Sequence, residues 1–353
     1  MVLPVRRKLP QFDARARAAL RKDLSFAATI ARSAPLQCLV QITNRCNMQC
    51  SFCDFWPNVA PRSEELTVSD YTRVSGELAG LGTAVISIEG GEPLLRKDLV
   101  GIVGAFGKHH IPMLFTNGWH VTEDMARALW DAGLVHAGVS IDYPDSERHD
   151  RKRGLQGATE RAWRAVETFR RTAPNGGKQV FVMTVLMESN WQDMEALLRK
   201  SEAAGVGHQT TLLSTGGFRR GKEGPDSLPP PEAGPSMVKL WERYRHLRYF
   251  HDYFATMEPF LRGGPMPTCE AGVQSFNIDH VGNVSPCIEK IDSVVGNVKK
   301  EPLGVLHRRL VDAASELSGC QDCWTACRGL AQALGRRGSV STLRDLATRM
   351  RPA

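Results

Sequence analysis

Cysteine is the residue type with the clearest chemistry in this chain, and three of its nine cysteines lie close together. Cys46, Cys50 and Cys53 have the spacing C-x3-C-x2-C. Three thiolates this close on one loop can face a common centre, but a structural zinc ion requires four ligands. A [4Fe–4S] cluster held by three cysteines keeps one iron open, which is useful where a small molecule must bind that iron. A structural metal knuckle or three unrelated thiols are the alternatives.

Five further cysteines lie near the C-terminus, and the ninth stands alone. Cys269 and Cys287 enclose the turn-forming segment 279–283, which predicts a β-hairpin with a cysteine near each end. A C-x2-C-x3-C run follows, formed by Cys320, Cys323 and Cys327. A zinc knuckle and an iron–sulfur cluster both fit these spacings. Cys38 lies in an apolar run, and we expect it to be a small buried residue.

The composition predicts a folded protein. Hydrophobic residues make up 42% and charged residues 24% of the 353 positions, which excludes disorder of the whole chain. No apolar run approaches the ~18 residues that a membrane helix needs, and residues 1–33 lack the apolar core of a signal peptide. We therefore expect a cytoplasmic protein, where reduced cysteines usually bind metals or act in catalysis. The net charge of +7 fits a solvated surface or an anionic partner, and no nucleic-acid-binding motif accompanies it.

The elements that must position the cysteines alternate between short apolar runs and helical patterns. Helix caps are predicted at Thr67, together with Asp70, and at Thr122. Predicted helices cover 67–81, 97–108, 122–132, 159–171 and 191–204. Predicted strands cover 38–43, 84–89, 112–116, 135–141, 179–187 and 208–213. Six β-α units predict a parallel sheet with helices outside, too few for a closed eight-unit barrel, so an open partial barrel is the expectation. Its reactive end should be the C-terminal edge of the strands.

The remaining segments complete the predicted organisation. Residues 1–35 form a helical lead-in and residues 36–215 the core. Residues 216–262 form a linker with a helix over 236–261, because 214–235 is rich in proline and glycine. Residues 263–330 carry the second cysteine group, and 331–353 form a tail.

The first cysteine group, with Phe52 just before its third cysteine, resembles the signature of the radical S-adenosylmethionine (SAM) superfamily. Further motifs follow in that family's order, each at the end of a predicted strand. The segment Gly90-Gly91-Glu92-Pro93 resembles the GGEP motif, which binds the amino group of SAM. The other residues that match the family's SAM contacts are Thr116, Asn117, Ser140, Asp142, Arg153, Met187 and Asn190.

This resemblance covers about residues 36–215 and implies a partial (β/α)6 barrel of the α/β class. It implies that Cys46, Cys50 and Cys53 hold a [4Fe–4S] cluster whose open iron binds SAM. An electron from an external reductant, such as flavodoxin or ferredoxin, then cleaves SAM to a 5′-deoxyadenosyl radical. That radical removes a hydrogen atom from the substrate.

The C-terminal segment resembles the SPASM extension of radical SAM enzymes, or its shorter twitch form. Cys269-Glu-Ala-Gly272 and the pattern from Asp279 to Cys287 carry this resemblance. Such a domain implies an auxiliary [4Fe–4S] cluster, hence two clusters in all. A full SPASM domain has seven cysteines and this segment has five, so the twitch form implies one cluster on Cys269, Cys287, Cys320 and Cys323. Cys327 is then an alternative ligand, a spare thiol or a hydrogen donor.

The expected reaction is oxidation of a small molecule, such as a sugar or aminocyclitol, with the auxiliary cluster accepting an electron. One alternative is an epimerase in which Cys327 returns a hydrogen atom. Another is peptide or protein modification, and a zinc-stabilised binding module is the non-catalytic alternative. Tyr143 and Asp145 are candidates for proton handling. The basic run 148–153 is interpreted as a solvated loop, with substrate phosphate binding as the alternative.

Overall fold

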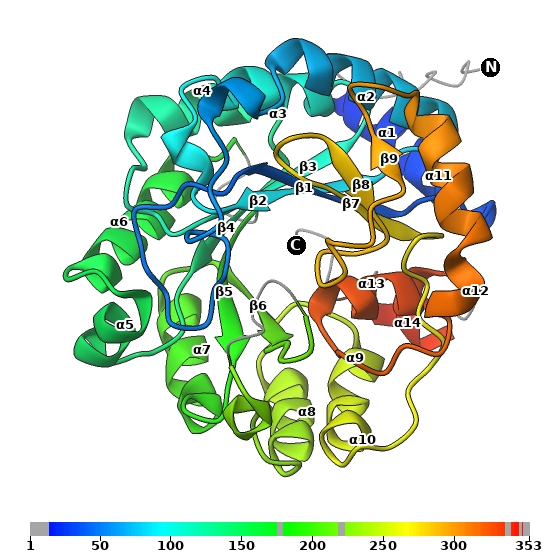
Figure 1. Ribbon diagram of the computed structural model, residues 1–353. Helices are drawn as coiled ribbons and strands as arrows, with labels where there is room; N and C mark the ends of the chain where they lie inside the picture. The colour runs from blue at the N-terminus through cyan, green and yellow to red at the C-terminus, as the bar shows by residue number, and fades with distance from the viewer. Residues whose placement is uncertain (1–13, 175–178, 218–222, 336–339, 346–347, 349–353) are drawn as a thin grey trace, which may run out of the picture.

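The strands build one sheet in this computed structural model, which describes residues 14–174, 179–217, 223–335, 340–345 and 348. Within that part of the chain the sheet has nine strands in the order β6-β5-β4-β3-β2-β1-β7-β8-β9 (Figure 1). The bounds are β1 Gln37–Thr43, β2 Val85–Gly90, β3 Ile111–Thr116, β4 His136–Ser140, β5 Val180–Leu186, β6 Gly207–Leu212, β7 Ser275–Ile278, β8 Asn283–Ser285 and β9 Gly296–Asn297. Strands β1 to β6 are parallel and sequential, which confirms the predicted α/β barrel.

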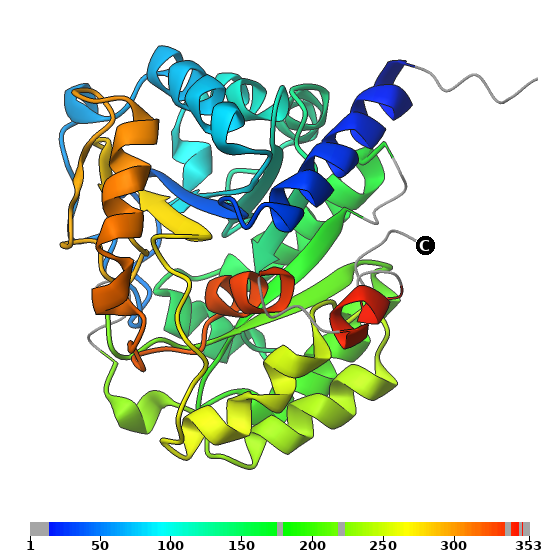
Figure 2. The same cartoon turned by 90° about the vertical axis from the view of Figure 1, so that its right-hand side faces the viewer.

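Most of the helices cover the outside of this curved sheet (Figure 1). Their bounds are α1 Ala14–Ala31, α2 Val68–Leu81, α3 Leu99–Gly107, α4 Glu123–Asp131, α5 Ser146–Arg153, α6 Ala158–Thr172, α7 Met194–Ala203, α8 Ala233–Arg243, α9 His251–Ala255, α10 Met257–Leu261, α11 Leu303–Asp312, α12 Ala314–Leu317, α13 Ala326–Leu334 and α14 Val340–Asp345. Short 3-10 helices are η1 Arg62–Glu64, η2 Pro93–Leu95, η3 Trp191–Asp193 and η4 Pro225–Ser227. Figure 2 shows α1 on the side of the molecule opposite to the loop that follows β1.

Local signals explain where these helices begin. Thr67 and Asp70 form a reciprocal capping box at the start of α2, and Thr122 accepts a hydrogen bond from the backbone N–H of Met125 at the start of α4.

Cys38 is fully buried between the sheet and its helices, which confirms its predicted packing role.

The segment with the second cysteine group continues the same sheet. Strand β7 pairs in parallel with β1, and the hairpin of β7 and β8 extends the sheet beyond it. Helix α13 contacts both β6 and β7, and the Ala326 N–H donates to Thr211 Oγ1 at 3.0 Å. The segment therefore bridges the gap between β1 and β6, where the barrel of six strands is open (Figure 1).

Two local predictions were wrong. The helix predicted over 236–261 is broken into α8, α9 and α10. The break occurs because residues 244–250 run along β6, where the His208 N–H donates to the His246 carbonyl and the Arg248 N–H donates to the His208 carbonyl, each at 2.8 Å. The basic run 148–153 lies on helix α5 instead of a loop. The tail predicted over 331–353 contains the end of α13 and α14, and residues 336–339, 346–347 and 349–353 lie outside the described part of the chain.

No helix among the described residues is both long enough and apolar enough to cross a membrane.

Candidate active site

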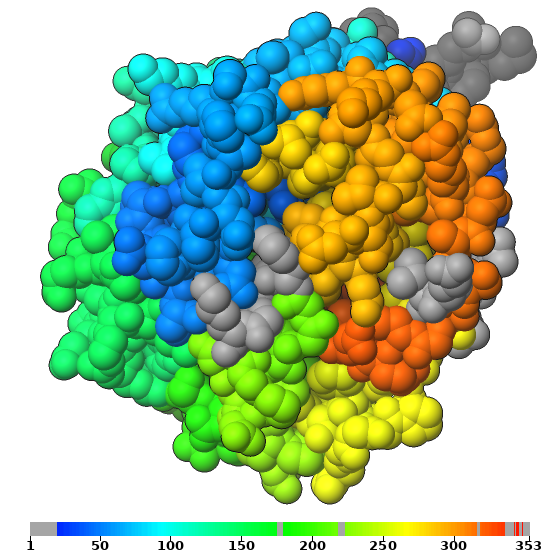
Figure 3. Space-filling model, viewed as in Figure 1, coloured from blue at the N-terminus to red at the C-terminus, as the bar shows by residue number. Residues whose placement is uncertain are grey.

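A cavity of about 1250 Å³ runs through the barrel and meets the ends of most of its strands. All three cysteines of the first group line it, and Cys327 is the one cysteine of the second group that does so among the described residues. The predicted SAM contacts that line it are Gly90, Gly91, Thr116, Asn117, Ser140 and Arg153. Figure 3 shows the loop after β1 and the segment after β7 on either side of the middle of this face. The structure thus brings the first cysteine group and Cys327 of the second group to one cavity.

Residues 44–66, here called the cysteine loop, are held by the two glycines at the end of β2. The Gly91 N–H donates to the Thr43 carbonyl at 2.7 Å, and the Glu92 N–H donates to the Arg45 carbonyl at 2.8 Å. A Cβ at position 91 would lie 2.1 Å from the Arg45 oxygen. A Cβ at position 90 would lie 2.2 Å from the Thr43 oxygen, and Gly90 has a φ of +128°. Only glycine permits this close approach of the two segments.

A buried carboxylate ties the cysteine loop to the segment after the glycines. Glu65, with a side chain 4% exposed, accepts hydrogen bonds from Thr43 Oγ1 at 2.6 Å and from both terminal nitrogens of Arg45 at 2.8 and 3.0 Å. Arg96 donates to the same carboxylate at 3.2 Å. Since Arg45 directly precedes Cys46, this network fixes the entrance to the loop. Sequence reasoning missed Glu65, because no motif links it to partners on other segments.

The Glu92 side chain joins the ends of β2 and β3 beside the cysteines. Its carboxylate accepts hydrogen bonds from the N–H groups of Leu94 and Asn117 and from Thr116 Oγ1, all within 2.9 Å. Complete burial raises the pKa of Glu92 to about 7, while these donors oppose the shift. The Asn117 amide also donates to Asn47 Oδ1 at 2.9 Å. Glu92 thereby positions Thr116 and Asn117, which line the cavity.

A buried ion pair connects the end of β4 with the first cysteine group. Arg153 and Asp142 lie 2.6 Å apart, and Asp142 also accepts the Val185 N–H at 2.9 Å. The Arg153 guanidinium stacks over Phe52 at 5.3 Å and lies 3.9 Å from Cys50 Sγ. Burial raises the pKa of the Cys50 thiol, and the positive charge of Arg153 opposes that effect.

Other predicted SAM contacts sit behind the cavity wall. The Asn190 side chain accepts the Met187 N–H at 2.7 Å and donates to the carbonyls of Asp142 and Val185 at 2.9 and 2.8 Å. It therefore fastens the end of β5 to the end of β4. The predicted contacts that do not line the cavity are Glu92, Pro93, Asp142, Met187 and Asn190.

The candidates for proton handling do not line the cavity either. Asp145 caps α5 by accepting the Arg148 N–H at 2.8 Å. The Tyr143 hydroxyl lies 2.7 Å from Ser189 Oγ, with the Arg148 guanidinium 4.6 Å above its ring. Two basic residues of α5 are paired at its surface, since Arg148 bonds Asp193 at 2.7 Å and Lys152 bonds Glu223 at 3.1 Å.

The second cysteine group gathers at the edge of the cavity. Burial raises the pKa of the thiols of Cys269, Cys287 and Cys323, and neighbouring cysteines of the group add to the increase. Cys327 Sγ lies 3.4 Å from Thr325 Oγ1. Cys53 and Cys327 both pack against an apolar cluster formed by Leu39, Phe55 and Ile288. The two cysteine groups are therefore neighbours across one small apolar cluster.

The thiols of the two cysteine groups are suitable ligands for iron–sulfur clusters. In the part of the chain that the structure describes, no three cysteine, histidine, aspartate or glutamate side chains are close enough to hold a single metal ion. Burial raises the pKa of Cys46 to about 12, so its thiolate needs a strongly positive partner. Iron supplies that charge, and thiolates are its preferred ligands in such clusters. Three thiols facing the cavity leave room for a SAM-binding cluster.

Comparison with known proteins supports the same chemistry. Residues 40–200 match the family model of the Radical SAM superfamily. The chain is 27% identical over 263 residues to the PqqA peptide cyclase of Granulibacter bethesdensis, covering 72% of this chain and 67% of that protein. It is 23% identical over 279 residues to the AdoMet-dependent heme synthase of Oleidesulfovibrio alaskensis, covering 70% of this chain and 68% of that protein. It spans only 35% of the PqqA peptide cyclase of a Methylobacterium species, where identity is 35% over 133 residues.

Solved structures share the fold. Streptococcus suis SuiB bound to the precursor peptide SuiA superposes with a TM-score of 0.61 at 15% identity, covering 87% of this chain and 73% of that one. The enzyme anSMEcpe with bound AdoMet and Cp18Cys peptide gives 0.60 at 18% identity, covering 90% and 96%. Residues 40–200 therefore form a domain of the Radical SAM superfamily, and the chain shares the fold of SuiB and anSMEcpe.

Proposed function

We propose that this chain cleaves SAM reductively and uses the resulting radical to modify a peptide. The observation that carries the proposal is the cavity of about 1250 Å³ that Cys46, Cys50, Cys53 and Cys327 all line. Pockets for one small ligand usually measure about 300–1,000 Å³. The cavity therefore offers space for SAM and for part of a second molecule.

Peptide modification has more support than the oxidation of a small sugar or aminocyclitol that the sequence led us to expect. PqqA peptide cyclases are among the relatives, and SuiB and anSMEcpe were solved with peptides. A likeness in fold does not transfer a substrate, so the peptide remains our proposal.

The residues divide into groups with different tasks. Cys46, Cys50 and Cys53 would hold the SAM-binding [4Fe–4S] cluster, which supplies the electron for SAM cleavage when bound. The residues that line the cavity, Gly90, Gly91, Thr116, Asn117, Ser140 and Arg153, would contact SAM directly. Behind them, Glu92, Asp142 and Asn190 hold these side chains and backbone groups in place through buried hydrogen bonds.

The second group would hold an auxiliary [4Fe–4S] cluster on Cys269, Cys287, Cys320 and Cys323. Cys327 differs from these four because it lines the cavity. That position supports a role as a free thiol facing the substrate. Its S–H can give a hydrogen atom to a substrate radical, which leaves a thiyl radical that one electron from the external reductant and one proton would return to the thiol. An external reductant such as flavodoxin or ferredoxin would supply the electron.

Anaerobic reconstitution tests this function. We expect about eight iron and eight sulfide per chain, and 5′-deoxyadenosine after reduction with dithionite in the presence of SAM. Cys50→Ala should abolish 5′-deoxyadenosine, whereas Cys287→Ala should halve the iron and retain SAM cleavage. Bound zinc in place of iron, with no cleavage of SAM, would refute the proposal and support a zinc-stabilised binding module.

A further inference from the structure

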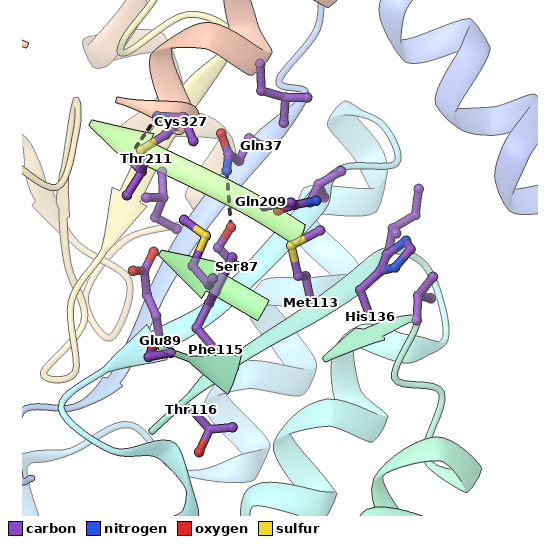
Figure 4. Close-up of a pocket in the computed structure, with 18 of the residues that line it drawn as sticks. Gln37, Ser87, Glu89, Met113, Phe115, Thr116, His136, Gln209, Thr211 and Cys327 are labelled. Carbon is purple, nitrogen blue, oxygen red and sulfur yellow. Dashed lines mark hydrogen bonds between the residues drawn. The ribbon is translucent and has the colours of Figure 1, made fainter. Parts of the chain in front are cut away.

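Uncharged polar side chains from three strands point into the middle of the cavity (Figure 4). They are Gln37 on β1, Ser87 on β2 and Gln209 on β6, here called the amide belt, and all three line the cavity. Strands β1 and β6 flank the open side of the six-stranded barrel, so the belt reaches from one side of the lumen to the other.

The amide belt has hydrogen-bonding capacity that the protein does not use. Gln37 is 7% exposed, and its Nε2 donates to Ser87 Oγ at 3.1 Å. Its Oε1 is buried without a hydrogen-bond partner. Gln209 is 9% exposed, and within the described residues its carboxamide makes no hydrogen bond. Buried polar groups without partners are rare in folded proteins, and those that line a cavity point to a ligand.

Apolar side chains lie beside the amide belt. Leu39, Met113, Phe115 and Met183 line the cavity beside it. Burial lowers the pKa of His136, which also lines the cavity, to about 4, so this imidazole is neutral at pH 7. The charged residues that line the cavity elsewhere are Lys22, Asp23, Glu89, Asp131 and Arg153.

These charged groups occupy other positions of the cavity lining. Glu89 follows Ser87 by two residues toward the cysteine end, and Arg153 lies beside Cys50 at that end. Lys22 and Asp23 belong to α1, which lies on the side of the molecule opposite to the cysteine loop (Figure 2). A charged group of a ligand bound to the amide belt would lose its hydration without gaining a counter-ion.

We infer that Gln37, Ser87 and Gln209 bind a neutral amide of the substrate that is flanked by apolar side chains. A carboxamide offers a donor and an acceptor in one plane, which pairs with the N–H and C=O of a peptide bond. The sulfur and aromatic groups of Met113, Met183 and Phe115 suit apolar side chains on either side. This inference rests on the proposed function, because it assigns the part of a peptide that enters the barrel.

Ligand-observed NMR on the reconstituted full-length holoenzyme with SAM tests this inference. The probe is N-acetyl-leucine N-methylamide, a single residue with two neutral amides, and N-acetyl-lysine N-methylamide and myo-inositol are the competitors. We expect the leucine probe to bind more tightly than the other two. Gln37→Leu and Gln209→Leu should each weaken its binding about five- to tenfold, the usual loss for one buried hydrogen bond. Gln156→Leu, which changes an exposed carboxamide, is the matched control and should bind as the wild type does.

The variant Gln209→Glu distinguishes the loss of a specific contact from poor folding, because it should gain binding of a different probe. A carboxylate at this position should reverse the preference and favour the lysine probe. Absence of leucine-probe binding, equal binding by the wild type and both leucine variants, or preference of the wild type for inositol would each overturn the inference. Formation of 5′-deoxyadenosine is measured in parallel without any probe, and its loss in the wild type would refute the proposed function while leaving the belt's binding result intact.

Discussion

Removal of the Glu65 carboxylate should destabilise the protein and disturb its first cysteine group. Glu65 accepts four hydrogen bonds from Thr43, Arg45 and Arg96, and its side chain is only 4% exposed. Breaking a buried ion pair by deleting one partner typically costs about 3–5 kcal/mol. Arg96 would keep Asp98 at 2.7 Å and the carbonyls of Ile42 and Leu66. We therefore expect the lower end for Glu65→Ala, a loss of about 3 kcal/mol.

Two assays separate the effects of this change. Urea unfolding of the apoprotein gives the free energy of unfolding. Iron content and 5′-deoxyadenosine yield after reconstitution report on the cysteine loop, since Arg45 directly precedes Cys46. We expect less iron and less SAM cleavage in Glu65→Ala even at low temperature, where the variant remains folded. The electron paramagnetic resonance signal of the reduced cluster, and its change on addition of SAM, should weaken to the same extent.

Glu195→Ala provides the matched control. Glu195 also accepts hydrogen bonds from three residues, Arg199, Arg243 and Tyr244, at 2.8 to 2.9 Å, but its side chain is 37% exposed. Exposed ion pairs contribute little because water and salt screen them. Equal losses of stability in the two variants, or normal iron and SAM cleavage in Glu65→Ala, would refute the reasoning that burial makes Glu65 important for the loop.

Three further predictions concern the close contact of Gly91 with Arg45, the role of Cys327 and the loss of stability in acid. Gly91→Ala should abolish SAM cleavage, because its Cβ would lie 2.1 Å from the Arg45 oxygen, whereas Gly224→Ala, with nothing within 4 Å, should retain it. Cys327→Ala should keep about eight iron per chain and Cys287→Ala about four, measured by colorimetric iron assay; a loss of iron in Cys327→Ala would show that Cys327 is a ligand. Burial lowers the pKa of His208 to about 3, so the unfolded chain takes up a proton there at a higher pH than the folded protein does. The stability contributed by neutral His208 is present above about pH 6.5 and is lost as the pH falls from there toward 3. His208→Gln should flatten the decline in the urea midpoint over this window, and an unchanged decline would contradict the assignment.

The fold was predictable wherever the sequence of one segment was enough to indicate its secondary structure. The alternation of apolar runs and capped helices located all six barrel strands and one helix between each successive pair of them. The prediction failed over 236–261, because the break depends on pairing between residues 246–248 and His208 on β6, a contact that no local pattern reveals. Helix α5 was missed because its charged sequence has no apolar stripe, although Asp145 and Gly154 mark its ends.

The cysteines and the glycine motif were predictable because their spacing alone carries the chemistry. Glu65 and the amide belt were not, since their roles arise only when separate strands come together. A weaker signal was nevertheless present in the sequence. Gln37 and Gln209 are polar residues in strands that are otherwise largely buried, at positions whose side chains point into the barrel. A glutamine at an inward position of a buried strand indicates either a partner or a ligand.

The sheet itself fixes the relation between the two cysteine groups. The cysteine loop begins where β1 ends, and Cys287 follows β8, whose hairpin partner β7 pairs directly with β1. The Leu66 N–H at the far end of the cysteine loop donates to the His280 carbonyl in the hairpin turn at 2.8 Å. Residues more than 200 positions apart in the sequence are thus held together by backbone hydrogen bonds and do not depend on the linker between them. The separation of two clusters bound here would follow from strand pairing, with Leu39, Phe55 and Ile288 filling the space between Cys53 and Cys327.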